Sequence, residues 1–189
     1  MKHLGRCVAL RSMAIVPDDK DWTWILDRPC PECRFDAKNI SPQETPALLR
    51  DLVNAWQEVL RRGDVADRPV PDKWSPLEYS CHVRDVFVLF DERLQLMLAH
   101  DGAVFEDWDQ DATAVTERYD LQDPMAVSQE IGEAGEALAA RFSLVEGSQW
   151  GHKGTRSNGS EFTVSTFAVY LVHDPIHHLW DVSGPQEHR

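Results

Sequence analysis

The chain has 189 residues, of which 42% are hydrophobic, and this composition is sufficient for one domain with a sizeable core. The formal net charge of −13 argues against nucleic-acid binding, because phosphates repel an acidic surface that has no concentrated basic patch. No apolar run approaches the roughly 20 residues that are needed to span a bilayer, so we do not expect a membrane protein.

The chain begins with residues 1–12, which carry positive charge but have too short an apolar run for a secretory signal. Met13 is an alternative start, which would make residues 1–12 a poorly ordered extension. Four cysteines without a signal peptide favour a reducing compartment over a disulfide scaffold. We therefore expect a cytoplasmic protein.

Cys30 and Cys33 form a C-x₂-C motif in a proline-rich turn, within an irregular N-terminal extension that we place at residues 1–40. The motif is typical of half a zinc site or of a redox pair, and the alternative is a purely structural turn. A closed zinc site would need two more ligands at matching spacing, and the sequence has no second C-x₂-C motif. We therefore predict that these cysteines hold no metal ion of their own.

Two helices are predicted from their start signals. Residues 41–44 (Ser-Pro-Gln-Glu) supply an N-cap serine, a proline at the first helical position and a capping-box glutamate, with Thr45 as a second start. This helix would end at Gly63. Residues 74–78 (Trp-Ser-Pro-Leu-Glu) repeat the signal and predict the second helix.

A polar and acidic stretch follows at residues 100–121, with Trp108 inside it, and its length favours a crossover connection over one end of a bundle. A third helix is predicted to begin at Asp123-Pro124 and to run to about Val145. The Gly, Asn and Ser content of residues 150–161 predicts a turn or a short hairpin.

The fourth predicted helix, residues 163–182, is the stretch that suggests chemistry, and its apolar residues recur at three- and four-residue spacing. His173 and His177 lie four residues apart, so their imidazoles would stack one turn apart and suit a single metal ion. Pro175 between them predicts a local bend or a 3₁₀-like turn. His82, on the apolar face of the second helix, is a candidate third ligand, and a packed core histidine is the alternative.

This arrangement resembles the DinB-like superfamily of metal-binding four-helix bundles. The residues that carry the resemblance are Trp74-Ser75-x₂-Glu78-x₃-His82-x₂-Asp85 and His173-Asp174-x₂-His177-His178. It implies an all-α four-helix bundle over residues 41–183, with a long crossover between the second and third helices. The irregular extension precedes the bundle, and residues 184–189 form a tail.

The resemblance also implies that His82, His173 and His177 are the three protein ligands of one divalent ion, zinc or nickel. Three neutral imidazoles leave open positions for water or a thiol, whose pKa the ion would lower. Asp174 and His178 directly follow the two ligands on the fourth helix, so they would point about 100° away and are not expected to ligate.

Ligand rings also need partners that fix their tautomers, and the nearest carboxylates in sequence are Asp85, Asp174 and Asp181. We expect the substrate pocket beside Trp74 and the 150–161 loop. Arg156 is the candidate cation for a substrate carboxylate, and an ordinary exposed loop residue is the alternative.

The family includes thiol-dependent transferases and isomerases, among them relatives that use bacillithiol or mycothiol. The resemblance thus implies a metal-dependent thiol S-transferase with a low-molecular-weight thiol as cosubstrate, or a small-molecule hydrolase. A non-catalytic, stress-associated metal-binding protein is one alternative, and a structural bundle whose histidines only pack is another. The expected partners are a small-molecule substrate and a second copy of the chain in a homodimer.

Overall fold

A computed structural model describes Ile15 and residues 20–184. The predictions for residues 1–12, for Met13 as the start and for the tail beyond Gly184 fall outside these residues. None of the helices described combines the length and the apolar character that a membrane crossing requires.

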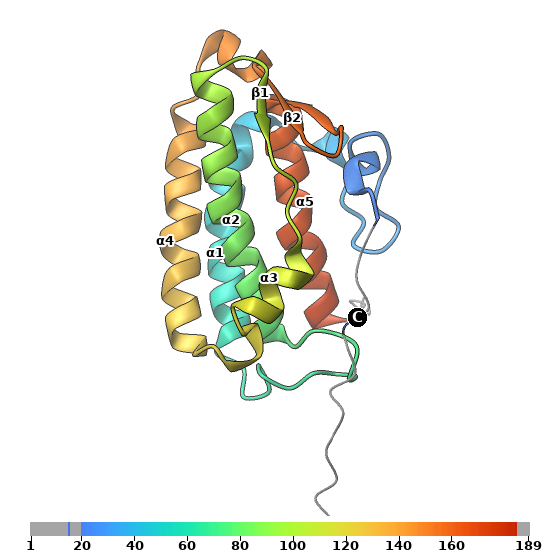
Figure 1. Cartoon of the computed structure of the whole chain (residues 1–189). Coiled ribbons are helices and arrows are strands. Elements are labelled where there is room, and N and C mark those ends of the chain that lie inside the picture. The colour runs from blue at the N-terminus through green and yellow to red at the C-terminus, as the bar shows by residue number, and fades with distance from the viewer. Residues whose placement is uncertain (1–14, 16–19, 185–189) are drawn as a thin grey trace, which may run out of the picture.

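Four long helices lie side by side and form the body of the molecule (Figure 1). They are α1 (Thr45–Leu60), α2 (Pro76–Ala99), α4 (Pro124–Ser143) and α5 (Val164–Ser183). Both α4 and α5 pack against α1 and α2, and together the four enclose the main hydrophobic core. The predicted four-helix bundle is therefore confirmed.

The predicted start signals act as expected, because each satisfies backbone N–H groups that have no partner inside the helix. At the start of α2, the Ser75 side chain accepts from the Glu78 N–H, and the Glu78 carboxylate accepts from the Ser75 N–H at 2.8 Å. Both predicted starts of the first helix are used. Ser41 caps a 3₁₀ turn, η3 (Pro42–Glu44), and α1 itself begins at Thr45.

A small sheet covers one end of the bundle, which the all-α prediction did not include (Figure 1). The predicted hairpin forms β2 (Lys153–Arg156) and β3 (Glu161–Thr163), which pair antiparallel. Preceding it is a 3₁₀ helix, η5 (Gly147–Gly151). Gly154 lies against α2, and a Cβ at this position would come within 2.8 Å of the Met97 side chain.

The crossover at residues 100–121 is also more regular than a loop. It contains β1 (Ala103–Phe105), α3 (Gln110–Thr116) and a 3₁₀ helix, η4 (Tyr119–Leu121). The β1 strand pairs in parallel with β2, and Ala103 of β1 lies opposite Gly154 of β2. This pairing ties the crossover to the hairpin.

The segment before the bundle lies along α5, on the side away from α4 (Figure 1). It contains two 3₁₀ helices, η1 (Trp22–Leu26) and η2 (Ala37–Asn39). A second hydrophobic cluster holds it there. The buried members of this cluster are Ile25, Cys30, Phe35, Leu52, Val169 and Val172. The segment is thus packed onto α1 and α5, and Cys30 and Cys33 of the C-x₂-C motif lie at this interface.

Candidate metal sites

Helix α5 carries potential metal ligands on two neighbouring faces. It stays α-helical from Val164 to Ser183, so the 3₁₀ turn predicted at Pro175 does not form. His173 and His177 share one face, which is turned toward the N-terminal segment. Asp174 and His178 follow them by one residue, and their face is rotated by about 100° toward α2.

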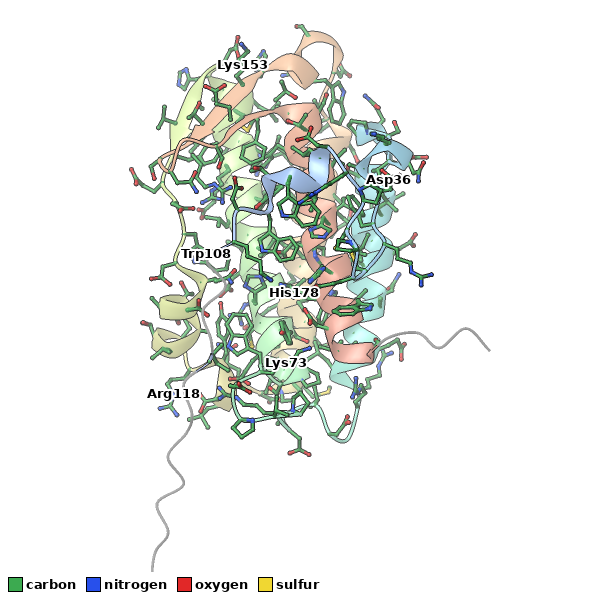
Figure 2. All side chains as sticks on the ribbon, turned by 90° about the vertical axis from the view of Figure 1, so that its right-hand side faces the viewer. Asp36, Lys73, Trp108, Arg118, Lys153 and His178 are labelled. Carbon is green, nitrogen blue, oxygen red and sulfur yellow. The ribbon has the colours of Figure 1, made fainter. Side chains whose placement is uncertain are left out.

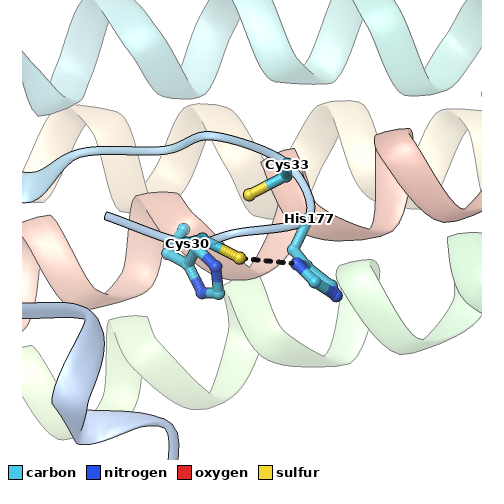
Figure 3. Close-up of side chains that lie close together, drawn as sticks. Cys30, Cys33 and His177 are labelled. Atoms are coloured by element: carbon cyan, nitrogen blue, oxygen red, sulfur yellow. Dashed lines mark hydrogen bonds between the residues drawn. The ribbon is translucent and has the colours of Figure 1, made fainter. Parts of the chain in front are cut away.

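The two histidines of the first face form a set of four potential ligands with two cysteines of the N-terminal segment. We call this set the cysteine–histidine group: Cys30, Cys33, His173 and His177. Each residue offers one ligand atom, and these atoms all lie within 4.8 Å of one another. The Cys30 thiol lies 3.6 Å from the His177 Nδ1 atom, and Cys33 stands beside it on the same loop (Figure 3). His173 and His177 are thus the two further ligands that the C-x₂-C motif needs and that its sequence neighbourhood does not show.

A tight backbone turn presents these two cysteines. The Cys30 N–H donates to the Phe35 carbonyl at 2.8 Å, and the Arg34 N–H donates to the Cys30 carbonyl at 3.0 Å. Arg34 has the left-handed φ of 63° that closes the turn. Burial raises the pKa of the Cys33 thiol to about 12, which keeps it protonated at neutral pH when no cation is near.

Both histidines of the cysteine–histidine group are neutral at physiological pH. Burial, reinforced by the neighbouring His177, lowers the pKa of His173 to about 4. Burial also lowers the pKa of His177, with a further contribution from His178. Neutral imidazole is the form that binds metal ions, so burial here prepares the rings for ligation.

The second face completes the histidine–aspartate group: His82, Asp174 and His178, again with ligand atoms within 4.8 Å of one another. The Nε2 atoms of His82 and His178 lie 3.4 and 3.9 Å from the same Asp174 oxygen, Oδ2. His82 is fully buried, and its ring stacks on Trp108 at 5.3 Å with an interplanar angle of 10°. Burial alone would raise the pKa of Asp174, but His82 and His178 outweigh it and hold that pKa well below its usual range.

The structure does not bring the three predicted ligands together. In the described part of the chain, no group of neighbouring ligand atoms contains His82, His173 and His177 together. His82 meets Asp174 and His178 instead, the two residues that were expected to point away. The reason is the rotation of α5 about its axis, because the face one residue further along is the one that is turned toward α2.

Asp181 orients the histidine–aspartate group from outside. Its Oδ2 atom lies 3.0 Å from His178 Nδ1, and its Oδ1 atom accepts from Lys73 Nζ at 2.9 Å. Burial would raise the pKa of Asp181, but these two hydrogen bonds lower it, so the side chain is a carboxylate. A carboxylate accepts from Nδ1–H, which leaves the lone pair of His178 on Nε2, the nitrogen nearer to Asp174.

Asp85, another predicted partner of the ligands, lies elsewhere. It accepts from Arg84 Nε at 2.8 Å and from the Tyr119 hydroxyl. Among the three carboxylates that were predicted to orient ligands, Asp181 contacts a ligand from outside, Asp174 belongs to a ligand group, and Asp85 joins a different network.

A cavity of about 890 Å³ opens beside both groups, and its wall includes His173 and His177 of the first group and Asp174 and His178 of the second. The predicted substrate residues Trp74 and Arg156 also line this cavity. Figure 2 shows His178 and Trp108 close together on the face that this view presents. Trp108 was not predicted to belong to the site, because it lies in the crossover and gains its contact with His82 only through the fold.

Arg156 is held at the cavity wall by aromatic rings. Its guanidinium lies 5.7 Å from the Phe162 ring centre and 5.8 Å from that of Tyr170. Asp107 accepts from it at a long 3.5 Å. The side chain is only 15% exposed, so it is not the exposed loop residue of the alternative interpretation. Its position suits recognition of an anionic group in the cavity.

Both groups have donor atoms that fit a metal ion. Three buried atoms, His82 Nδ1, Asp174 Oδ1 and His173 Nε2, have no hydrogen-bond partner among the residues described. Each buried polar atom without a partner costs about 1–3 kcal/mol. Coordination at Asp174 Oδ1 or His173 Nε2 would give that atom a partner, whereas His82 faces Asp174 through Nε2 and not through its unpaired Nδ1. Imidazole, carboxylate and thiolate are the ligands that zinc and related ions prefer.

The fold and the site together define a four-helix bundle protein that carries potential metal-ligand groups beside a cavity. The chain belongs to the DinB superfamily, whose family model matches residues 49–182. This confirms the resemblance that the sequence motifs indicated. The matched region contains the whole histidine–aspartate group, whereas Cys30 and Cys33 precede it.

One solved structure is similar over most of its length. It is YfiT from Bacillus subtilis, described as a probable metal-dependent hydrolase with an unusual four-helix bundle topology. The TM-score is 0.59 at 18% sequence identity, over 75% of this chain and 81% of that chain. At this identity the likeness shows a shared fold. No curated protein matches the chain.

Proposed function

We propose that the protein is a metal-dependent enzyme that acts on a small molecule in the 890 Å³ cavity, with the histidine–aspartate group as its metal centre. The observation that carries the proposal is that Asp174 and His178 line the cavity and form, with His82 behind them, a set of only three ligands. His173 and His177 line the same cavity but belong to a set of four ligands, which would leave no open position on an ion. Membership of the DinB superfamily and the likeness to YfiT support metal dependence.

The residues around the proposed centre have separate roles. His82, Asp174 and His178 would hold the ion, and three protein ligands leave a position open for a reactant. A bound divalent ion supplies Lewis acidity, which activates a nucleophile or polarises a carbonyl group. Asp181 fixes the His178 tautomer, and the stacked Trp108 ring keeps water away from His82.

The chemistry that best suits this cavity is attack of water or a small thiol on an electrophilic molecule. Arg156 can bind a carboxylate on the substrate or on a low-molecular-weight thiol. Such a cation matters in this chain, because the net charge of −13 repels anions in general. Hydrolysis and thiol S-transfer are thus the two reactions that we propose to test.

The test is a screen of small electrophiles with water, mycothiol, bacillithiol and glutathione as acceptors, on metal-loaded protein. We expect Asp174→Ala to reduce turnover by about 100-fold or more, because it removes a proposed ligand. His100→Ala, which alters an exposed histidine at the end of α2, is the matched control and should retain activity. Turnover that survives Asp174→Ala would place the reaction elsewhere, and no turnover with any acceptor would favour a non-catalytic binding protein.

Arg156→Gln tests substrate recognition separately. It removes the charge and keeps much of the side chain, so we expect KM for an anionic substrate to rise about 10-fold or more with little change in kcat. An uncharged substrate analogue should be affected much less. Equal effects on both substrates would show that Arg156 supports the hairpin and does not bind the anion.

A further inference from the structure

We propose that the cysteine–histidine group is a second metal site, a closed tetrahedral zinc centre that fastens the N-terminal segment to α5. Its ligands would be Cys30, Cys33, His173 and His177, whose ligand atoms lie within 4.8 Å of one another. This site is separate from the catalytic centre proposed above and shares no ligand with it.

The spacing of the four ligands is that of a Cys₂His₂ zinc site. Cys30 and Cys33 are separated by two residues, and His173 and His177 by three. Zinc binds two thiolates and two imidazoles in a tetrahedron, and four protein ligands leave no position open for substrate. The group is therefore suited to a structural role.

The charges of the ligands also match zinc. Binding of Zn²⁺ would release one proton from each thiol, so the two thiolates balance the two positive charges of the ion. A neutral centre suits this position, because Cys30, His173 and His177 are all buried.

Glu32 supports one of the ligands from outside. Its carboxylate lies 3.2 Å from His177 Nε2, while Nδ1 of the same ring faces the Cys30 thiol at 3.6 Å. Donation from Nε2–H to Glu32 would leave the Nδ1 lone pair directed at the ion. Glu32, which directly precedes Cys33, thus completes the carboxylate–histidine arrangement that is common at zinc sites.

The centre would also influence the cavity. It links residues 147 positions apart in the chain, which restricts the unfolded state and holds the segment on α5. Trp22 and Glu32 of this segment line the cavity, and Trp22 contacts the His177 ring at 4.9 Å. On α5, Asp174 directly follows His173, and His178 directly follows His177. Holding the helix at one rotation about its axis therefore positions the ligands of both groups.

The experiment uses the full-length chain without a His-tag, purified under reducing conditions, and cobalt as a spectroscopic substitute for zinc. We expect a thiolate-to-cobalt charge-transfer band in the wild type, loss of this band in Cys30→Ser, and its retention in His178→Ala. Cys81→Ser is the matched control, because Cys81 is buried but lies outside the group. Zinc content should fall by one ion per chain in Cys30→Ser and stay unchanged in Cys81→Ser.

If Cys30→Ser fails to fold, the wild type still decides the question. A mercurial thiol reagent should then release one zinc ion per chain from both the wild type and His178→Ala. A cobalt-loaded wild type without the charge-transfer band would overturn the proposal. So would a Cys30–Cys33 disulfide in protein kept from oxidants, which would identify a redox pair.

Discussion

His178→Ala is expected to weaken metal binding at the histidine–aspartate group by more than about 100-fold, because it removes a ligand atom. Asp181→Asn should cost less, roughly 10- to 100-fold, because Asp181 only orients His178 through a 3.0 Å hydrogen bond. Competition with a chromophoric chelator measures both affinities. The charge-transfer band of the cysteine–histidine group reports the other ion independently.

The informative result is which of the two variants, His178→Ala or Asp181→Asn, loses more metal affinity. His100→Ala serves as the control and should bind metal as the wild type does. Equal losses in His178→Ala and Asp181→Asn would mean that His178 is not a ligand. An unchanged affinity in His178→Ala would remove the histidine–aspartate group as a metal site.

Trp56→Ala is expected to give the largest loss of stability, about 3–5 kcal/mol, because it leaves a large cavity in the core. Trp56 is fully buried between the helices, and its indole N–H donates to the Pro175 carbonyl at 3.3 Å. This bond anchors α5 at Pro175, which lies between the first and the second residue of each ligand pair. Urea unfolding of metal-free protein measures the change.

The matched control for this prediction is Trp150→Ala, since Trp150 is only partly buried at the sheet end of the bundle. We expect it to cost clearly less than Trp56→Ala. A loss below about 1 kcal/mol in Trp56→Ala would contradict the packing described for α1 and α5.

Much of the fold was predictable because its signals are local. The capping boxes at Ser41 and Ser75 involve residues three positions apart, so the sequence displays them directly. The β1 strand was not predictable in this way. It is three residues long, and its register with β2 pairs Ala103 with the distant Gly154. The expected homodimer remains a prediction.

The sequence indicated which residue types could bind a metal ion, but it did not indicate which of these residues lie together in one group. Helical spacing places His173 with His177 and Asp174 with His178, and both pairs have the separation that metal ligands need. Only the rotation of α5 decides which pair meets His82, and that rotation depends on packing across the whole bundle. The partners of Cys30 and Cys33 were missed because they lie more than 100 residues away in the chain. Joining C-x₂-C to H-x₃-H regardless of the intervening length would have found them.

The most direct test of this account is the metal content of the wild type, His177→Ala, His178→Ala and Cys30→Ser, each purified without a tag and loaded with zinc. The two-group arrangement predicts two ions per chain in the wild type and one in each variant. In cobalt-substituted samples, the thiolate-to-cobalt band should be retained in His178→Ala and lost in Cys30→Ser. A single ion per chain that is lost in His177→Ala and kept in both His178→Ala and Cys30→Ser would contradict it. That result would restore His82, His173 and His177 as one ligand set.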